Sequence, residues 1–122
     1  MKKIAVIIDS DEKVRSISKM TLEGAGYTVF SCHNIKEGNQ VLNQVQADVL
    51  VCNHDQTDGC SIDLVSDLKK NDPLYRHLPV VVTSTAADEN KKESAKKAGA
   101  SAFVVNPLDT SKLLSTINTI SA

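Results

Sequence analysis

The sequence predicts a doubly wound α/β domain in which five parallel strands alternate with five helices, a (βα)5 arrangement. Five short apolar runs, rich in β-branched residues, alternate with amphipathic stretches along the 122 residues. Several runs are continuously apolar, which is typical of parallel strands covered by helices on both faces. Connections of this kind are right-handed crossovers. The length fits one core, so we expect residues 1–122 to form a single domain.

Each apolar run is expected to be one strand. The five runs are residues 3–8, 28–31, 49–52, 80–83 and 102–105. The first run stops at Asp9 and is too short for a secretory signal or a membrane span, so we expect no membrane association.

Polar capping residues mark where the first two helices begin. The first helix is expected near Asp11, with Ser10 or Asp9 available as its cap. The second is expected after Asn34, with Glu37 three residues later completing a capping box. Both starts follow directly on a predicted strand.

The last three helices are also bounded by typical start and stop residues. The third is expected to end before Asp72, the fourth to run from 88 to 98 and stop at Gly99, and the fifth to begin at Asp109 or Thr110. Residues 89–97 contain Ala95 as their only apolar residue. The fourth helix is therefore expected to bury little surface, either as a plain solvated face or as a mobile partner-binding face.

Composition excludes several classes of function. The chain has 14 basic and 15 acidic residues, and nucleic-acid binding normally requires a basic excess, so we expect no nucleic-acid partner. Only two tyrosines and two phenylalanines are present, too few for base-stacking platforms. Three cysteines without close pairing indicate a reducing, cytoplasmic location.

Polar residues collect where the predicted strands end. In a doubly wound sheet these carboxyl ends form the functional edge, so residues distant in sequence meet in one shallow pocket. The residues concerned are Asp9, Asp11, Asn53, His54, Asp55, Ser84, Thr85, Asn106 and Pro107.

Several stretches resemble the receiver domains of bacterial response regulators, the CheY-like family, along essentially the whole chain. They are KIAVIID at 3–9, GAGY at 24–27, ADVLV at 47–51, DP at 72–73, HLPV at 77–80 and KAGASAF at 97–103. The resemblance implies a flavodoxin-like sheet of order 2-1-3-4-5 and a role in two-component phosphorelay signalling. It also implies a signalling protein as partner, and a domain that is not itself an enzyme.

In that family two acidic residues after the first strand hold Mg²⁺ together with an aspartate that accepts a phosphoryl group. A hydroxyl side chain bonds the phosphate, and a lysine before a cis proline neutralises it. Carboxylates suit a hard dication, and Mg²⁺ and lysine stabilise the charged transition state.

Carried over residue by residue, the resemblance is partial. Asp9 matches the first acidic residue, but Ser10 falls on the second and Asn53 on the phosphate acceptor. Ser84 matches the hydroxyl position, and Asn106 falls on the lysine. The resemblance thus implies a degenerate phosphorylation pocket without a catalytic residue.

The same carry-over places Pro107 on the cis proline and Phe103 on an aromatic that changes rotamer in many members. The loop after the third strand departs from the family, with Thr57 in place of a proline and Ser61 in place of a glycine.

These departures have chemical consequences. An amide is not a carboxylate nucleophile, so no acyl phosphate forms at Asn53. Mg²⁺ affinity falls with the number of charged ligands, so we expect weak or lost binding and no cofactor. Asn53 and Asn106 are expected to hydrogen-bond each other or Ser84. Restoring the aspartate alone, Asn53→Asp, should not restore phosphorylation.

We therefore expect an atypical receiver that acts by phosphorylation-independent protein binding, as a monomer or weak dimer. The resemblance places the partner face on the fourth helix, fifth strand and fifth helix. The residues of this face are Lys91, Lys92, Lys96, Phe103 and Leu108. Its lysines would attract an acidic partner.

Two other functions stay open. The chain could be a phospho-acceptor that uses Asp55, with Asp9 and Asp11 holding Mg²⁺, although Asp55 and Asp58 are expected to be solvated loop residues. Alternatively, the altered pocket could bind a small ligand. A soft metal site is a third possibility, but the spacing is not a zinc pattern. Its candidate ligands are Cys32, His33, Cys52, His54 and Cys60.

Overall fold

The computed structural model describes residues 2–105 and 107–121. Five strands form one parallel sheet in the order β2-β1-β3-β6-β7, which confirms the expected order 2-1-3-4-5. These strands are β1 (Ile4–Ile8), β2 (Thr28–Cys32), β3 (Val49–Asn53), β6 (Val80–Ser84) and β7 (Ala102–Val105). The helices are α1 (Glu12–Gly24), α2 (Ile35–Gln44), α3 (Ser61–Asn71), α4 (Glu89–Ala98), α5 (Thr110–Ile120) and the short 3-10 helix η1 (Pro73–Tyr75).

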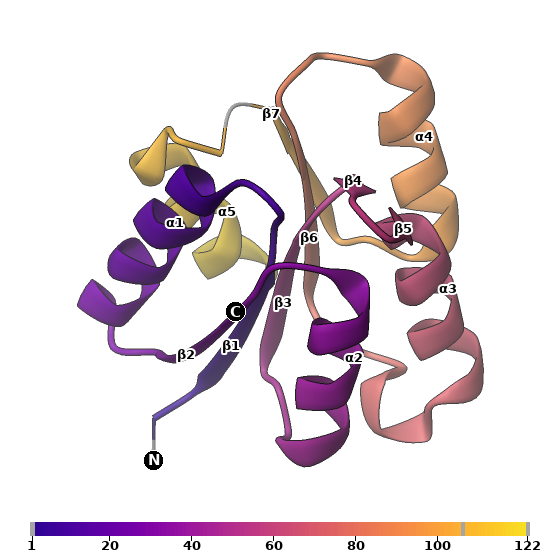
Figure 1. The fold of residues 1–122 in the computed structure, drawn as a ribbon, viewed down its shortest axis with the longest axis horizontal. Helices are drawn as coiled ribbons and strands as arrows, with labels where there is room; N and C mark the ends of the chain where they lie inside the picture. The colour runs from indigo at the N-terminus through magenta and orange to yellow at the C-terminus, as the bar shows by residue number, and fades with distance from the viewer. Residues whose placement is uncertain (1, 106, 122) are drawn as a thin grey trace.

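Helices cover both faces of the sheet, so alternate residues of each strand enter two separate cores. Helices α1 and α5 lie on one face, and α2, α3 and α4 lie on the other (Figure 1). Val6 and Ile8 of β1 belong to the core under α2 to α4, whereas Ala5 and Ile7 belong to the core under α1 and α5. Burial on both faces explains why the strands read as continuous apolar runs.

The strand boundaries differ slightly from the expected ones. Strand β1 begins at Ile4 rather than Lys3, and β2, β3 and β6 each continue one residue further than predicted. Asn53 and Ser84 are therefore the last residues of their strands, not loop residues. Polar residues at strand ends carry no apolar signal, so sequence patterns miss them.

An unexpected two-stranded antiparallel hairpin follows β3. Its strands are β4 (Asp55–Gln56) and β5 (Gly59–Cys60), and they pair with each other rather than with the main sheet. The hairpin lies beside α3 and α4 at the end of the molecule where the main strands finish (Figure 1). We call residues 54–60 the brace hairpin.

Side-chain caps start four of the five α-helices that the structure describes. Asp11, Asn34, Asp88 and Asp109 each accept a backbone N–H of the first helical turn. For α1 the cap is Asp11 itself, not Ser10 or Asp9. The predicted capping box at Asn34 is half formed, because the Glu37 carboxylate instead lies 2.7 Å from Nδ1 of His33.

Helix α4 buries only Ala95 and Ala98, as its sequence predicts. It ends at Gly99, whose φ of 108° is in the left-handed region. Among the residues that the structure describes, no helix is both long and apolar enough to cross a membrane.

Candidate functional site

The candidate site lies at the carboxyl edge of the sheet. Asp9 directly follows β1, Asn53 ends β3 and Ser84 ends β6. In the strand register Ile8 lies beside Cys52, and Asn53 lies beside Thr83. The parallel register therefore brings three of the expected pocket residues to one edge, as a doubly wound sheet requires.

Asp9 and Asn53 form the centre of this site. Asp9 is only 3 % exposed, and its Oδ1 accepts the backbone N–H of Asp11 at 2.9 Å. The Asn53 side chain lies beside the Asp9 carboxylate and lowers its pKa. Asn53 Oδ1 accepts the backbone N–H of Asp55 at 2.9 Å, so its NH2 group is the part of the amide that can favour the charged carboxylate.

Burial dominates the electrostatics of Asp9. Loss of solvation raises the pKa of its carboxyl above the ordinary 3.8, and the nearby Asp11 carboxylate adds to this. The Asp11 N–H, Arg15 and Asn53 act in the opposite direction. Arg15 Nη1 also donates to the backbone carbonyl of Asp9 at 2.7 Å, so α1 fixes the end of β1.

The other pocket residues are less closely joined. Ser10 is exposed, and Ser84 is buried with its hydroxyl donating to the Ala86 carbonyl at 2.9 Å. The expected hydrogen bond from Asn53 to Ser84 is not among the bonds of the described residues. Asn106 lies outside those residues, and so does the peptide bond that would make Pro107 a cis proline; Pro107 itself is buried.

The carboxylates of the brace hairpin are exposed, as expected, but both also bind other elements. Asp58 accepts the backbone N–H groups of Ile35 and Lys36 at 2.9 and 3.0 Å, which binds it to the start of α2. Asp55 Oδ2 lies 2.6 Å from Nζ of Lys91 on α4. The sequence does not reveal these partners, because they are distant along the chain.

The contacts of two further residues of the brace hairpin, Gln56 and His54, were not predicted. Gln56 donates through Nε2 to the carbonyls of Ile8 and Asn53 at 3.0 and 2.9 Å, joining the ends of β1 and β3. His54 Nδ1 lies 2.9 Å from Asp55 Oδ1. A polar residue in a loop gives no periodic signal, so only the departure of this loop from the family pattern pointed to it.

The expected partner face is partly hollowed. A groove of about 230 Å³ lies between α4 and β7, and Phe103, Lys92 and Lys96 are among its lining residues. A second hollow of about 190 Å³ shares Lys92 and Phe103 with it. Leu108 is 39 % exposed. Lys91 differs from the expectation, because it lines neither hollow and faces Asp55 instead.

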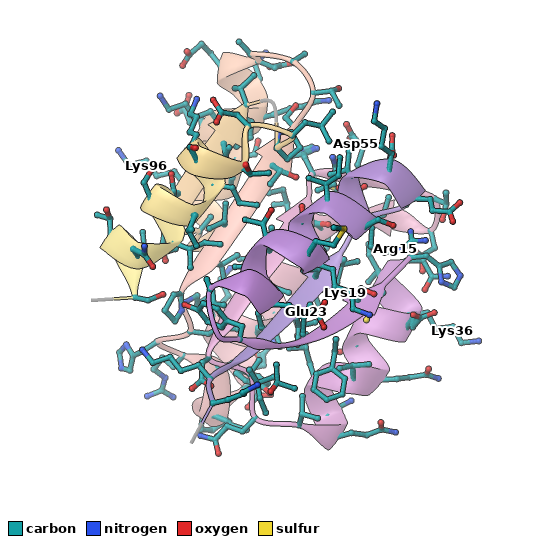
Figure 2. The ribbon with its side chains drawn as sticks, turned by 90° about the vertical axis from the view of Figure 1, so that its left-hand side faces the viewer. Arg15, Lys19, Glu23, Lys36, Asp55 and Lys96 are labelled. Carbon is teal, nitrogen blue, oxygen red and sulfur yellow. The ribbon has the colours of Figure 1, made fainter. Side chains whose placement is uncertain are left out.

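Helix α1 presents a charged row on the other side of the molecule. Arg15, Lys19 and Glu23 follow one another along this helix, and Asp55 lies at the end of the molecule where α1 begins (Figure 2). Met20 on the same helix is 71 % exposed.

Residues 5–118 match the family described as the response regulator receiver domain. The chain belongs to this family. The match spans both helical layers and all five strands of the main sheet.

Known receiver proteins resemble this chain over its full length. The chemotaxis protein CheY of Thermotoga maritima is 25 % identical over 122 residues, covering 99 % of both chains. Protein PilH of Pseudomonas aeruginosa is 27 % identical and covers 100 % of this chain and 99 % of its own length. Other relatives are longer. The chain spans 46 % of the KDP operon transcriptional regulatory protein KdpE of Escherichia coli and 24 % of the response regulator protein PilR of Pseudomonas aeruginosa.

Solved receiver structures share the fold. The chemotaxis response regulator CheY4 of Vibrio cholerae superposes with a TM-score of 0.90 at 21 % identity, covering 98 % of this chain and 99 % of that one. A response regulator of Burkholderia pseudomallei, solved with a phosphorylated aspartic acid, a calcium ion and citrate, superposes with a TM-score of 0.86 at 20 % identity, covering 98 % and 69 %. These likenesses support the fold assignment.

Receiver domains usually bind Mg²⁺, but the described residues of this receiver do not fit the ion. Asp9 is buried, and its Oδ1 accepts the backbone N–H of Asp11. Asp11 is held as the cap of α1, and Asp55 is paired with Lys91. Within residues 2–105 and 107–121, no three His, Cys, Asp or Glu side chains are grouped to hold a metal ion. A hard dication requires several free oxygen ligands converging on one point.

The soft-metal candidates are also dispersed in this receiver. Cys32 and Cys52 are core residues, and burial raises their pKa to about 11 and about 12. His33 pairs with Glu37. Cys60 is partly exposed, with its Sγ 3.7 Å from Nε2 of His54. The buried cysteines act as small apolar residues, as such strand cysteines usually do.

Proposed function

We propose that this receiver works without phosphorylation, as a protein-binding module of two-component signalling in the cytoplasm. The observation that carries the proposal is the amide of Asn53, which ends β3 at the carboxyl edge beside the buried Asp9 and accepts the backbone N–H of Asp55. An amide in this position is not a nucleophile for a phosphoryl group, and its N–H groups offer no ligand to Mg²⁺. Ser10 stands where the family has its second acidic residue, and Asn106 stands where it has the lysine, so these two groups are missing as well.

The three departures support one another electrostatically. Asp9 is a single buried carboxylate whose Oδ1 accepts the backbone N–H of Asp11. A lysine in place of Asn106 would have no acceptor carboxylate to pair with, and an unpaired buried cation is costly. We therefore propose that the whole pocket has changed together, and that Asn53 alone does not account for it.

Phosphorylation can be tested by incubating the protein with acetyl phosphate and Mg²⁺ and measuring its intact mass. The wild type should gain no phosphoryl group of about 80 Da. Asn53→Asp should gain far less than an ordinary receiver, such as the CheY of Thermotoga maritima used as positive control. Ser10→Asp, Asn53→Asp and Asn106→Lys together should gain more than Asn53→Asp alone.

The opposite result has a defined meaning. A mass gain by the wild type that is lost in Asp55→Asn would show that Asp55 is the acceptor and that the domain is a conventional phosphorelay component. Full phosphorylation of the Asn53→Asp single variant would contradict the idea of a pocket changed at several positions.

Signalling without a phosphate requires a surface that is available in the unmodified protein. The groove beside Phe103 is lined by apolar residues and by two exposed lysines, Lys92 and Lys96. Such a surface suits an acidic segment with one or two apolar anchors, because the lysines speed encounter and the groove buries the anchor.

The partner surface can be tested with a photo-crosslinking residue placed at Lys92 in cells that produce the protein. A discrete crosslinked species should form from Lys92 and be lost when Lys96→Glu is added. The matched control is the same crosslinker at Lys36, which lies on α2 (Figure 2). Equal crosslinking from both positions would contradict a specific face on α4.

A further inference from the structure

The brace hairpin connects three parts of the receiver that are far apart in sequence. Gln56 binds the ends of β1 and β3, and Asp58 binds the first turn of α2. Asp55 binds Lys91 on α4. The first two contacts fix the hairpin to the rigid sheet and to α2, so the third contact transmits that fixed position to α4.

Helix α4 packs against α3 and β7 through little apolar side-chain surface. Its buried residues are two alanines, Ala95 and Ala98, which contribute little apolar area each. Its remaining described residues are polar, and apart from Lys91 they are exposed. Helices anchored by so little apolar surface open locally at low free energy. Among the described residues, the contact of Lys91 with Asp55 is the one side-chain hydrogen bond or ion pair that joins α4 to another element.

The contact itself is well formed. Asp55 Oδ2 lies 2.6 Å from Lys91 Nζ, and Oδ1 lies 2.9 Å from His54 Nδ1, so both carboxylate oxygens are engaged. The His54 side chain is only 13 % exposed and therefore fixes the direction of the carboxylate. A charge-assisted bond with one partner held in place loses less side-chain freedom than a typical surface pair.

We propose that Asp55 and Lys91 form a latch through which the brace hairpin sets the position of α4, and with it the groove beside Phe103, in the absence of a phosphate. The latch is independent of which partner binds. Its consequence for signalling rests on the proposed phosphorylation-independent function, because the latch would hold the partner face in one arrangement at all times.

The chain offers a matched control on the same helix. Lys97 lies 3.4 Å from Glu93, one turn earlier, and both side chains are exposed. That pair joins α4 to itself, so removing it changes helix charge but not the connection to the hairpin. A charge effect and a latch effect are thereby distinguished.

The test is amide hydrogen exchange of wild type, Asp55→Asn, Lys91→Met and the double variant, read by mass spectrometry on peptides covering α4. Each single variant should speed exchange across α4 by up to about five-fold, the range for ion pairs with one exposed partner. The double variant should not exceed the faster single variant, because both remove the same contact. Lys97→Met should leave exchange unchanged.

Two readings would overturn the latch: unchanged α4 exchange in both single variants, or effects that multiply in the double variant. Peptides from β1 and β3 serve as the reference for global unfolding, so a rise confined to α4 supports the latch and a uniform rise in all peptides contradicts it. The reversed pair Asp55→Lys with Lys91→Asp should recover protection. Phosphate uptake by the wild type would end the proposed function while leaving the latch standing.

Discussion

Single residues of this receiver act through close contacts that their types alone do not reveal. Gly38 lies inside α2, where glycine normally weakens a helix. A Cβ at this position would lie 2.2 Å from Cδ1 and 2.6 Å from Cγ1 of Ile8, which is fully buried at the end of β1. Gly38 therefore permits α2 to approach the sheet beside Asp9.

Gly38→Ala is expected to destabilise the protein by up to about 2 kcal/mol, since overpacking costs ~1–3 kcal/mol and improved helix propensity returns about 1 kcal/mol. Urea denaturation gives the free energy of unfolding. The control is Gly24→Ala, because nothing lies within 4 Å of a Cβ there; it should be neutral or stabilising by up to about 1 kcal/mol. A Gly38→Ala protein as stable as Gly24→Ala would contradict the close approach.

At the scale of elements, long-range side-chain hydrogen bonds hold the segments between strands. Tyr75, at the end of η1, is 1 % exposed. Its hydroxyl hydrogen-bonds the carbonyls of Leu42 and Val45 at 2.8 and 2.6 Å and lies 3.2 Å from the Ala47 N–H. One phenol thus satisfies the carboxyl end of α2.

Tyr75→Phe is expected to lower the free energy of unfolding by about 1–3 kcal/mol, because it leaves buried backbone groups without their partner. Thermal or urea denaturation measures the change. Tyr27→Phe is the matched control, since no hydrogen bond of the Tyr27 hydroxyl occurs among residues 2–105 and 107–121. Equal loss in the two variants would mean that the hydroxyl network contributes nothing beyond ring packing.

The brace hairpin is the second example at this scale. Gln56, Asp58 and Asp55 each bind a different element, so this short hairpin connects α2, the sheet and α4 at the carboxyl edge. The Lys91 amino group, followed by His54, lowers the pKa of Asp55, so the carboxylate of the latch stays ionised at neutral pH.

For the whole molecule, buried and capping carboxylates impose opposite pH dependences on stability. Asp9 has a raised pKa, so the folded state retains its proton longer than the unfolded state. Its contribution is therefore present below about 3.8 and is lost as the pH rises through the folded pKa. The N–H groups of Ile35 and Lys36 lower the pKa of Asp58. Its contribution to stability is therefore present above the ordinary 3.8 and is lost as the pH falls through the folded pKa.

We compare the free energy of unfolding of the wild type minus that of a variant. For Asp9→Asn this difference should fall as the pH rises from 3.8 towards neutrality. For Asp58→Asn it should rise as the pH rises from below 3.8 through this value. Urea denaturation across this pH range measures both. Any effect of a substitution on the free energy of unfolding that does not depend on pH cancels, because only the slope of the difference with pH is compared. Parallel slopes for the two variants would contradict the assigned direction of at least one pKa shift.

The sequence by itself determined the (βα)5 order and the chemistry of Asn53. It also predicted both ends of β7, and it predicted the other four strands of the main sheet except for one residue at one end of each. Apolar periodicity and helix caps are local signals, and each follows from forces acting within a few residues. Asp88 and Gly99, for example, were readable as the ends of α4 because caps act on the adjoining turn.

Only the tertiary structure decided what the polar residues of the site do. The Asn53 amide lies beside Asp9, and Gln56 binds the ends of β1 and β3. Asp55 pairs with Lys91 on α4. The last pair is 36 residues apart. Its formation depends on how the hairpin and α4 are brought together, and an exposed polar side chain carries no pattern in the sequence that encodes its distant partner.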